Sequence, residues 1–247
     1  MQNIFNRAER LLGTETMQRI AAKRVLIIGV GGVGSWCAES LVRSGIQSLT
    51  IVDSDCVCES NVNRQLMATM RTIGRPKVEA LKERLLEINP TADITAICEI
   101  YSEERNALFN LDSFDYIIDC IDSLKDKMAL LLNATKTRAT VFSSMGAALK
   151  MDPTQIKVAE YWKVRGCPLG AALRKKMKRA GLKPAKPVMC VYSEELLENK
   201  GCDNEGPEAL NTGSGIKAQV NGTMAHITAI FGFTLAGLVL QNAAYSS

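Results

Sequence analysis

Charged and amide side chains crowd one short stretch of this sequence, DSDCVCESNVNRQ at positions 53–65, and Lys77 follows soon after it. Arginine and lysine can offset the charge that develops on phosphate oxygens during a displacement at phosphorus, and a carboxylate can hold Mg²⁺. The stretch therefore offers the groups that this chemistry needs. The residues in question are Asp53, Asp55, Asn61, Arg64, Gln65 and Lys77.

A second pair of acids stands in the sequence FDYIIDCIDS, where Asp119 and Asp122 follow apolar residues. Taken alone, Asp122 could cap a helix, and Arg64 or Lys77 could be an ordinary solvated charge. Their joint spacing, after apolar runs that are typical of buried strands, favours a common role. Because ligands of open parallel sheets bind beyond the carboxyl ends of the strands, we expect these groups to converge on one crevice.

An apolar run leads directly into glycines in the sequence VLIIGVGGVGSW, positions 25–36. Gly29, Gly31 and Gly34 fit the pattern G-x-G-x-x-G, a tight turn that lets backbone N–H groups approach a phosphate at a helix N-terminus. Asp53 follows about 20 residues later, where an acid can accept hydrogen bonds from ribose hydroxyls. The pattern predicts a nucleotide site and fits a dinucleotide as well as ATP.

The other residues decide between hydride transfer and phosphate chemistry. A dehydrogenase needs a nicotinamide pocket and usually a proton donor, and no such donor stands out in the sequence. The single histidine, His226, lies near an apolar segment and is interpreted as structural. Arg64, Lys77 and Asp122 together favour attack on a phosphate of ATP.

Alternating strands and helices must position these groups. The predicted architecture is an α/β fold, a doubly wound and mostly parallel Rossmann-like sheet with N-terminal helices and a C-terminal apolar helix. Strands are expected at 24–28, 48–53, 94–100, in FDYIIDCID and in TVFSSMGA. Helices are expected over 1–22, over 33–44, from Pro76 as the first helical residue, over 124–134 after the cap Ser123, and over 220–244.

The composition excludes several classes of protein. The chain has 247 residues, 47% of them hydrophobic and 23% charged, which is typical of a soluble globular protein. Its N-terminus lacks the apolar region of a signal peptide. The eight cysteines include no C-x-x-C pair, so a zinc site is not expected, and we interpret them as reduced, mostly buried thiols of a cytoplasmic protein.

The second half of the chain changes in character. Residues 163–186 contain nine Lys or Arg and no acid, whereas residues 194–208 contain six acids and one Lys and are interpreted as a mobile loop. The apolar segment near the C-terminus is shorter than the roughly 20 residues of a membrane span. A core helix or a dimer interface is the favoured interpretation, with peripheral membrane contact as the alternative.

The motifs GVGGVGSW, D-x-D with N-x-N-R-Q, G-R-P-K and D-C-I-D-S resemble the ubiquitin-activating-enzyme-like adenylating superfamily, the group of the ThiF and MoeB proteins. Three later motifs, DPTQIKV, CPLGAALRKKMK and CVYSEE, resemble the tRNA threonylcarbamoyladenosine dehydratases within it. The resemblance implies one adenylating domain over 1–247, with a nucleotide-binding core at 1–150 and a region for tRNA and dimer contacts at 151–247.

The resemblance also assigns roles. ATP would lie against Gly29, Gly31, Gly32 and Gly34, with Asp53 on the ribose and Asp55 nearby. Asn61, Arg64, Gln65 and Lys77 would contact the phosphates, and Asp122 would coordinate Mg²⁺. Arg7 would reach into the site of a partner subunit in a homodimer, with Arg10 as a competing candidate. The tRNA would meet the basic run through Arg174, Lys175, Lys176, Lys178 and Arg179, unless that run is simply a solvated helix face.

The implied reaction is the ATP-dependent cyclisation of threonylcarbamoyladenosine in tRNA, in which the threonine carboxylate is adenylated and then attacked within the same side chain. This step needs no cysteine nucleophile, although Cys190 is the best candidate if a thioester forms. Family members can also use a monovalent cation (K⁺ or Na⁺) and a sulfur-relay protein partner, but the segment VAEYWKV departs from the family pattern expected there.

Two other functions stay open at this stage. The first is activation of a small sulfur-carrier protein, which the missing zinc cysteines and the basic run disfavour. The second is a scaffold that binds nucleotide or tRNA without catalysis, which the presence of Arg64, Lys77 and Asp122 disfavours.

Overall fold

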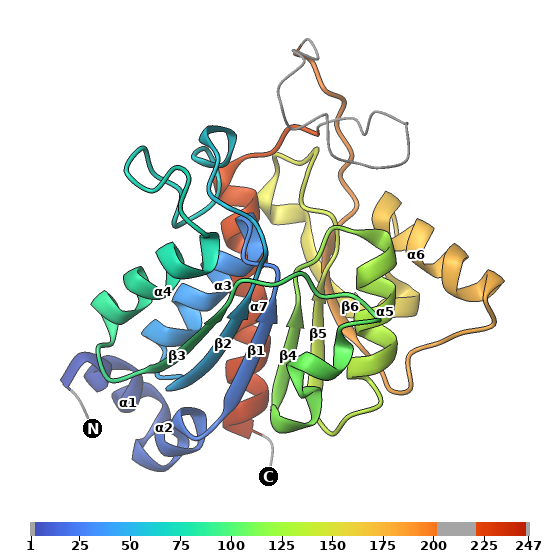
Figure 1. Ribbon diagram of the computed structural model, residues 1–247. Helices are drawn as coiled ribbons and strands as arrows, with labels where there is room; N and C mark the ends of the chain where they lie inside the picture. The colour runs from blue at the N-terminus through green and yellow to red at the C-terminus, as the bar shows by residue number, and fades with distance from the viewer. Residues whose placement is uncertain (1–2, 202–220, 246–247) are drawn as a thin grey trace.

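A seven-stranded sheet forms the centre of the computed structural model, which describes residues 3–201 and 221–245. The strands lie in the order β3-β2-β1-β4-β5-β7-β6, and all neighbours are parallel except β6 and β7 (Figure 1). This arrangement confirms the predicted α/β fold. The strands are β1 Arg24–Ile28, β2 Ser48–Val52, β3 Asp93–Ile97, β4 Tyr116–Asp119, β5 Thr140–Ser144, β6 Ile156–Glu160 and β7 Met189–Ser193.

Helices cover both faces of the sheet, as Figure 1 shows. The α-helices are α1 Asn6–Leu12, α2 Thr14–Ala21, α3 Gly32–Arg43, α4 Lys77–Ile88, α5 Leu124–Ala134, α6 Pro168–Arg179 and α7 Ala225–Tyr245. Short 3₁₀ turns are η1 Asn3–Phe5, η2 Glu59–Asn61, η3 Asn106–Phe109, η4 Leu111–Ser113, η5 Pro153–Gln155 and η6 Tyr161–Lys163.

Two apolar cores result from the alternation of side chains along each strand. In β1, Val25 and Ile27 join the core beneath α3, α4 and α7, whereas Leu26 and Ile28 join the core beneath α5 and α6. Successive side chains of a strand point to opposite faces, so a strand covered on both faces is apolar throughout. This is why the run before the glycines carries no polar residue.

Helix α7 is long and apolar enough to cross a membrane by length and composition, yet 56% of its apolar window is buried inside the protein. Phe231, Leu235 and Val239 belong to the core shared with α3. The ring of Phe233, which is 46% exposed, meets Trp36 of α3 edge to face at 5.8 Å between centroids. The expected core helix is therefore present.

The structure corrects several boundaries. The helix expected over 1–22 is broken at Gly13, whose φ of 82° ends α1 and precedes α2. Pro76 is the N-cap rather than the first residue of α4, and the third strand ends at Ile97 rather than at residue 100. Ser123 does cap α5, accepting a hydrogen bond from the Asp126 N–H.

The cysteine prediction was wrong in part. Cys37, Cys167 and Cys190 are buried free thiols, but the free thiols Cys56, Cys58 and Cys98 are exposed. Cys56 and Cys58 lie in the loop after β2, and Cys98 follows Ile97, the last residue of β3, so at all three the chain has already left the sheet. Of the expected mobile loop at 194–208, residues 202–208 lie outside the described part of the chain.

Candidate active site

Three predicted motifs meet at one edge of the sheet. In the registers of the neighbouring strands, Ile28 at the end of β1 pairs with Val52 of β2 on one side and with Asp119 of β4 on the other. The chain leaves β1 for β2 and later returns to β4, so the direction of winding reverses between β1 and β4. Such a reversal opens a crevice at the carboxyl ends of the strands, which is where ligands of this fold bind.

The glycine loop after β1 is tightly fitted to its neighbours. Gly29 has a φ of 89°, and a Cβ there would lie 2.7 Å from the Cys120 carbonyl oxygen. At Gly34 a Cβ would lie 1.9 Å from the Gly29 carbonyl oxygen. Gly31 is the N-cap of α3 and supplies no side chain to the first turn. Only glycine permits this approach, and it brings the N–H groups of the helix N-terminus to the crevice.

Asp53, the acid after β2, holds the loop from the opposite side. Its Oδ2 accepts a hydrogen bond from the Val30 N–H at 2.9 Å, and its Oδ1 accepts one from the Asp55 N–H at 3.0 Å. Burial raises the pKa of the Asp53 carboxyl, and nearby Lys77 offsets part of that effect. Each carboxylate oxygen retains a second lone pair that can accept a bond from a ribose hydroxyl.

The amide and cationic groups of the 53–65 stretch and of α4 are held in place as well. Lys77 is 6% exposed, and its Nζ lies 2.8 Å from Oδ2 of Asp55. Asn61 is buried, and its Oδ1 accepts a hydrogen bond from the Cys58 N–H at 3.1 Å. The Arg64 Nη1 donates to the Ser60 carbonyl at 2.7 Å.

Hydrogen bonds from helix α3 and from the C-terminal part of the chain fix the backbone of this stretch. The Arg64 carbonyl accepts bonds from the Trp36 indole N–H at 3.1 Å and from the Thr228 hydroxyl at 3.4 Å. Asn63 donates through Nδ2 to the Thr223 carbonyl at 3.0 Å. Residues far apart in the sequence thus fix the backbone that carries Arg64.

Gln65 has a buried oxygen without a partner. Its side chain is 6% exposed, and among the described residues its Oε1 is the one buried side-chain polar atom that lacks a hydrogen bond. Its Nε2 would lie 3.7 Å from a Cβ on Gly31, so the amide points at the glycine loop. An orphaned buried polar group in a native fold calls for an explanation, and a polar ligand in the crevice provides one.

The two acids after β4 have different environments. Asp119 is fully buried and forms an ion pair with the equally buried Lys127, at 2.7 Å between Oδ2 and Nζ. Its carboxylate also accepts bonds from the Ser143 hydroxyl at 2.6 Å and the Ile121 N–H at 3.1 Å. Asp122 is exposed in the turn before α5, where it is open to a ligand.

Lys127 is a residue that the sequence reasoning missed. Its Nζ donates to the Ile121 carbonyl at 2.9 Å, and the Asp119 carboxylate accepts a bond from the Ile121 N–H. The buried pair therefore fixes the backbone of Ile121, the residue before Asp122. A signal was available in the sequence. Lys127 shares a helical face with Leu130, Leu131 and Ala134, and a lysine inside an apolar stripe is usually paired.

Arg7 does not join the other predicted residues within one chain. It is exposed on α1, which lies near the end of the sheet where the strands begin, whereas the motif loops lie where they end (Figure 1). The competing Arg10, also on α1, donates through Nε to Asn6 at 2.8 Å.

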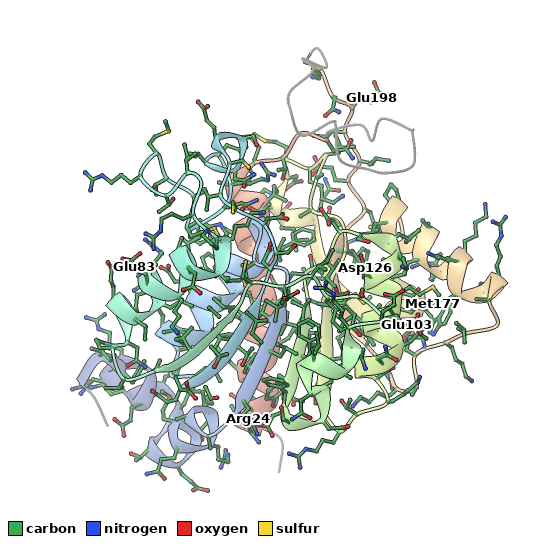
Figure 2. All side chains as sticks on the ribbon, in the orientation of Figure 1. Arg24, Glu83, Glu103, Asp126, Met177 and Glu198 are labelled. Carbon is green, nitrogen blue, oxygen red and sulfur yellow. The ribbon has the colours of Figure 1, made fainter. Side chains whose placement is uncertain are left out.

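The basic run forms α6 and the segments around it, beside α5 on the second face of the sheet. Figure 2 labels Asp126 on α5 and Met177 on the buried face of α6. Two cations contact η6: Arg174 donates to the Tyr161 carbonyl at 3.3 Å, and the Lys178 Nζ lies 5.9 Å from the centre of the Trp162 ring. The remaining predicted cations, Lys175, Lys176 and Arg179, are exposed.

Cys190 and His226 occupy structural positions. Cys190 lies in β7, fully buried, and burial raises the pKa of its thiol well above the ordinary range. A neutral thiol is a poor nucleophile, so this environment disfavours the thioester alternative. The His226 Nε2 lies 2.9 Å from the Met151 carbonyl oxygen, on the side of α7 that meets the loop after β5.

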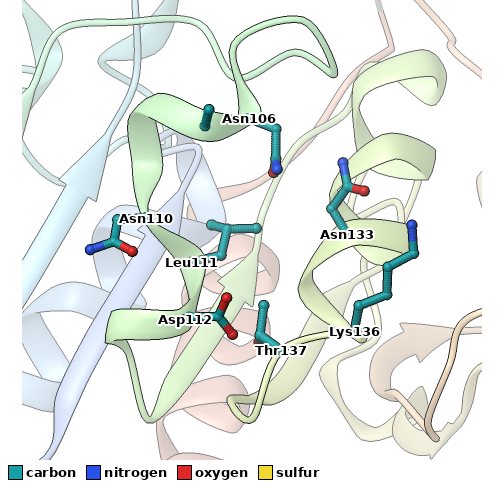
Figure 3. A pocket seen from close by; sticks show the side chains of 8 residues that line it. Asn106, Asn110, Leu111, Asp112, Asn133, Lys136 and Thr137 are labelled. Carbon is teal, nitrogen blue, oxygen red and sulfur yellow. The ribbon is translucent and has the colours of Figure 1, made fainter.

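A polar pocket of about 350 Å³ lies elsewhere, between the η3–η4 segment and the C-terminal end of α5 (Figure 3). None of the residues that the sequence singled out lines it. Its lining residues are Asn106, Ala107, Asn110, Leu111, Asp112, Asn133, Lys136 and Thr137. The crevice at the carboxyl edge, where the motifs converge, is therefore the candidate active site.

Comparisons with known proteins identify relatives along most of the chain. The family model described as ThiF family matches residues 5–242. The tRNA threonylcarbamoyladenosine dehydratase of Escherichia coli is 33% identical over 251 residues, covering 96% of this chain and 92% of the relative. The enzyme of the same name from Bacillus subtilis is 38% identical over 195 residues, covering 79% of this chain and 76% of the relative.

A solved structure is similar along nearly the whole chain. The crystal structure of the E. coli tRNA N6-threonylcarbamoyladenosine dehydratase, TcdA, in complex with ATP matches with a TM-score of 0.84 at 32% identity. The match covers 97% of this chain and 93% of that one. The chain therefore belongs to the ThiF family and, within it, to the tRNA threonylcarbamoyladenosine dehydratases.

Proposed function

We propose that this protein uses ATP to dehydrate threonylcarbamoyladenosine in tRNA, closing a ring after adenylation of the threonine carboxylate. Its relatives with this name, and the ATP complex of one of them, support the proposal. The observation that carries it is the crevice after β1, β2 and β4, where the glycine loop, Lys77 and Asp122 share one edge of the sheet.

The residues of the crevice suit ATP. The N–H groups at the N-terminus of α3 and the NH₂ of Gln65 can donate to phosphates, the unpaired Gln65 Oε1 can accept from a donor group of the nucleotide, and Asp53 can accept from the ribose. Lys77 and Arg64 would offset charge on the phosphate oxygens. Asn61 stabilises the turn before Arg64, and Asp55 orients the Lys77 ammonium group through their ion pair. Gly29, Gly31, Gly32 and Gly34 would form the loop beneath the phosphates.

Asp122 would hold Mg²⁺. A magnesium ion is commonly bound by one or two carboxylates together with substrate phosphates, and it neutralises charge on those phosphates when bound. Asp122 is exposed in a turn that the Asp119–Lys127 pair fixes, which supports this assignment. A monovalent cation, K⁺ or Na⁺, stays a prediction from the family resemblance.

The chemistry needs little from titratable side chains. A carboxylate with an ordinary pKa of about 3–4 is already ionised at neutral pH, so its attack on the α-phosphate requires no general base. A bond forms from the carboxylate oxygen to the α-phosphorus and pyrophosphate leaves. The ureido group of the same side chain then attacks the activated carboxyl carbon, AMP leaves, and a proton is released to solvent. The protein orients these groups and stabilises charge.

The rest of the proposal concerns partners. We divide the chain into a nucleotide-binding part at 1–150 and a part for tRNA and dimer contacts at 151–247. The basic helix α6 lies in the second part and would bind tRNA. A homodimer would bring α1, with Arg7, to the crevice of the partner. A cytoplasmic location fits a tRNA substrate, and a sulfur-relay partner stays a prediction from the resemblance.

Mass analysis of tRNA nucleosides tests the reaction. Purified protein is incubated with tRNA that carries threonylcarbamoyladenosine, with ATP, without ATP, and with an ATP analogue that cannot be cleaved between the α- and β-phosphates. We expect a nucleoside lighter by one water only with ATP. An unchanged nucleoside, together with pyrophosphate exchange that depends on a small sulfur-carrier protein, would replace this proposal by the carrier-activating alternative.

A further inference from the structure

A second hollow lies between helices α5 and α6, apart from the crevice. It has a volume of about 530 Å³, within the range of about 300–1,000 Å³ that is usual for small-ligand pockets. Three of its six lining residues are cations and three are apolar. They are Lys175, Lys176, Arg179, Leu124, Ala172 and Ala180.

Helix α6 divides its cations between two sides. Lys175, Lys176 and Arg179 lie with Ala172 and Ala180 at the spacing i, i+3, i+4, i+7 and i+8, which places them along one side of the helix. Arg174 and Lys178 are instead engaged by η6 through the Tyr161 carbonyl and the Trp162 ring. The first set faces the hollow, and within residues 3–201 and 221–245 no acid lines it.

The lining combines two kinds of recognition. Lysine ammonium groups suit phosphates, and an arginine guanidinium can both bind phosphate and stack on a base. Leu124, Ala172 and Ala180 add an apolar surface against which a planar base can lie. A nucleobase with its phosphate matches this lining better than an inorganic anion, which would leave the apolar part uncovered.

The position of the hollow indicates the course that a bound RNA strand would take. Leu124 is the first residue of α5 and the second residue after Asp122, so one wall of the hollow continues from the turn that carries the candidate magnesium ligand. A strand of RNA with one nucleotide in the hollow would therefore run toward the crevice.

We propose that the α5–α6 hollow binds one unpaired nucleotide of an RNA strand, next to the nucleotide whose side chain is adenylated. This inference rests on the proposed function for its direction, but the binding of single-stranded RNA by the hollow can be measured on its own. Single-strand recognition works through bases that are splayed out and stacked, which a duplex does not offer.

The test uses the full chain and a fluorescent single-stranded RNA heptamer, with a blunt duplex of the same length for comparison. Two double variants each remove one lysine and one arginine from α6: Lys175→Ala/Arg179→Ala on the hollow, and Arg174→Ala/Lys178→Ala as the matched control. We expect the first to raise the Kd for the heptamer by about tenfold or more, and the control by less than about threefold.

A third variant, Ala172→Leu, fills the hollow without changing charge. It should weaken binding of the heptamer while leaving the slope of binding against salt unchanged, since that slope counts phosphate contacts. ATP affinity, measured in parallel, should be equal in all variants and reports an intact fold.

Several outcomes would overturn the inference. Equal losses of heptamer affinity in the two double variants would mean that α6 acts only through a diffuse positive field. Unaltered heptamer binding by Ala172→Leu would mean that nothing enters the hollow. Equal affinity for the heptamer and the duplex would exclude recognition of an unpaired nucleotide. If the heptamer behaves as expected but tRNA is never dehydrated, the proposed function fails and the nucleotide site stands.

Discussion

Two regions, the crevice at the carboxyl edge of the sheet and helix α6, carry most of the candidate functional charge, and their side chains are held in different ways. In the crevice, Asn61, Gln65 and Lys77 are at most 6% exposed and lie in a backbone fixed by hydrogen bonds. On α6, Lys175, Lys176 and Arg179 are exposed, and no carboxylate of the described residues forms an ion pair with them.

The difference follows from what each region would act on. Stabilising charge that develops at one phosphorus atom requires groups held in place before the reaction, because reorganising them would cost part of the gain. Binding a polyanion depends on neutralising many phosphates and releasing their counterions, for which exposed and adaptable cations suffice. Burial therefore separates Lys77 from the exposed cations of α6, which sequence clustering does not, whereas the exposed Asp122 is held in place through the buried Asp119–Lys127 pair.

The largest effect on turnover is expected at Asp122. Asp122→Asn keeps the size of the side chain and removes the carboxylate, so dehydration should fall on the order of a thousandfold while the fold persists, because metal-assisted charge stabilisation supplies several kcal/mol. The measurement is the rate of nucleoside conversion at saturating ATP, with circular dichroism for the fold. The matched control is Asp126→Asn on α5, whose carboxylate accepts from the Ser123 hydroxyl. Full ATP-dependent activity of Asp122→Asn would exclude the magnesium assignment.

A large effect on stability is expected at the buried ion pair. Lys127→Met leaves the Asp119 carboxylate buried without its cation, which should lower the free energy of unfolding by about 3–5 kcal/mol. Lys125→Met is the control on the same helix. Its ion pair with Glu104 spans 3.4 Å between exposed side chains and should contribute less than about 1 kcal/mol. Urea unfolding measures both.

The companion variant Lys127→Met/Asp119→Asn removes both charges and should recover much of that loss. If Lys127 also positions the turn of Asp122, the recovered protein will need more Mg²⁺ for half-maximal turnover than the wild type, although its stability is restored. Equal losses for Lys127→Met and Lys125→Met would mean that burial of the pair carries no weight.

A smaller, partial effect is expected from mixing subunits. Arg7→Ala and Asp122→Asn should each be nearly inactive alone, but after exchange half of the dimers are mixed and each holds one intact site, so activity should return to about a quarter of the wild type. A mixture of Arg10→Ala with Asp122→Asn is the control. No recovery despite demonstrated exchange would place Arg7 in its own chain or give the role to Arg10.

Much of the fold could be predicted from sequence because local patterns match it. The apolar runs of β1, β2 and β4 are buried on both faces, and their glycine and aspartate ends mark the edge of the sheet. Strands β6 and β7 were not predicted. In β6 only Ile156, Ala159 and Glu160 are partly buried, so an antiparallel edge strand gives neither a continuous nor an alternating apolar signal. The break at Gly13 depends on a single backbone angle.

The candidate site could be predicted only as a set of residue types. The sequence indicated that Asp119 and Asp122 end a strand, but it did not indicate which of the two is buried. Asp119 is buried because it forms an ion pair with Lys127, which lies eight residues after it in the sequence. Likewise, the bonds from Trp36 and Thr228 to the Arg64 carbonyl join three distant segments, so no local pattern carries them. The two sides of α6 became distinct only when α5 and η6 were placed beside it.

The smallest effect on turnover is expected at Cys190, and it tests whether all catalytic charge lies in the crevice. The thiol lies in β7 opposite Ser143, fully buried, and its Sγ is 3.7 Å from the Val188 carbonyl oxygen. Because burial raises its pKa, the thiol stays neutral at pH 7, and Cys190→Ala should keep activity within about threefold while losing about 1 kcal/mol of stability to the smaller side chain.

The pH dependence of that loss can be predicted as well. A raised thiol pKa in the folded state favours folding below the ordinary thiol pKa and loses that contribution as pH rises above it, because the unfolded chain can then ionise while the buried thiol cannot. The stability difference between wild type and Cys190→Ala should therefore shrink between about pH 8 and pH 10. Urea unfolding across that range measures it, with the exposed Cys56→Ala as the control that should show little change in stability. Loss of turnover in Cys190→Ala, together with a covalent adduct on the wild-type thiol during turnover, would instead make β7 part of the catalytic machinery through a thioester.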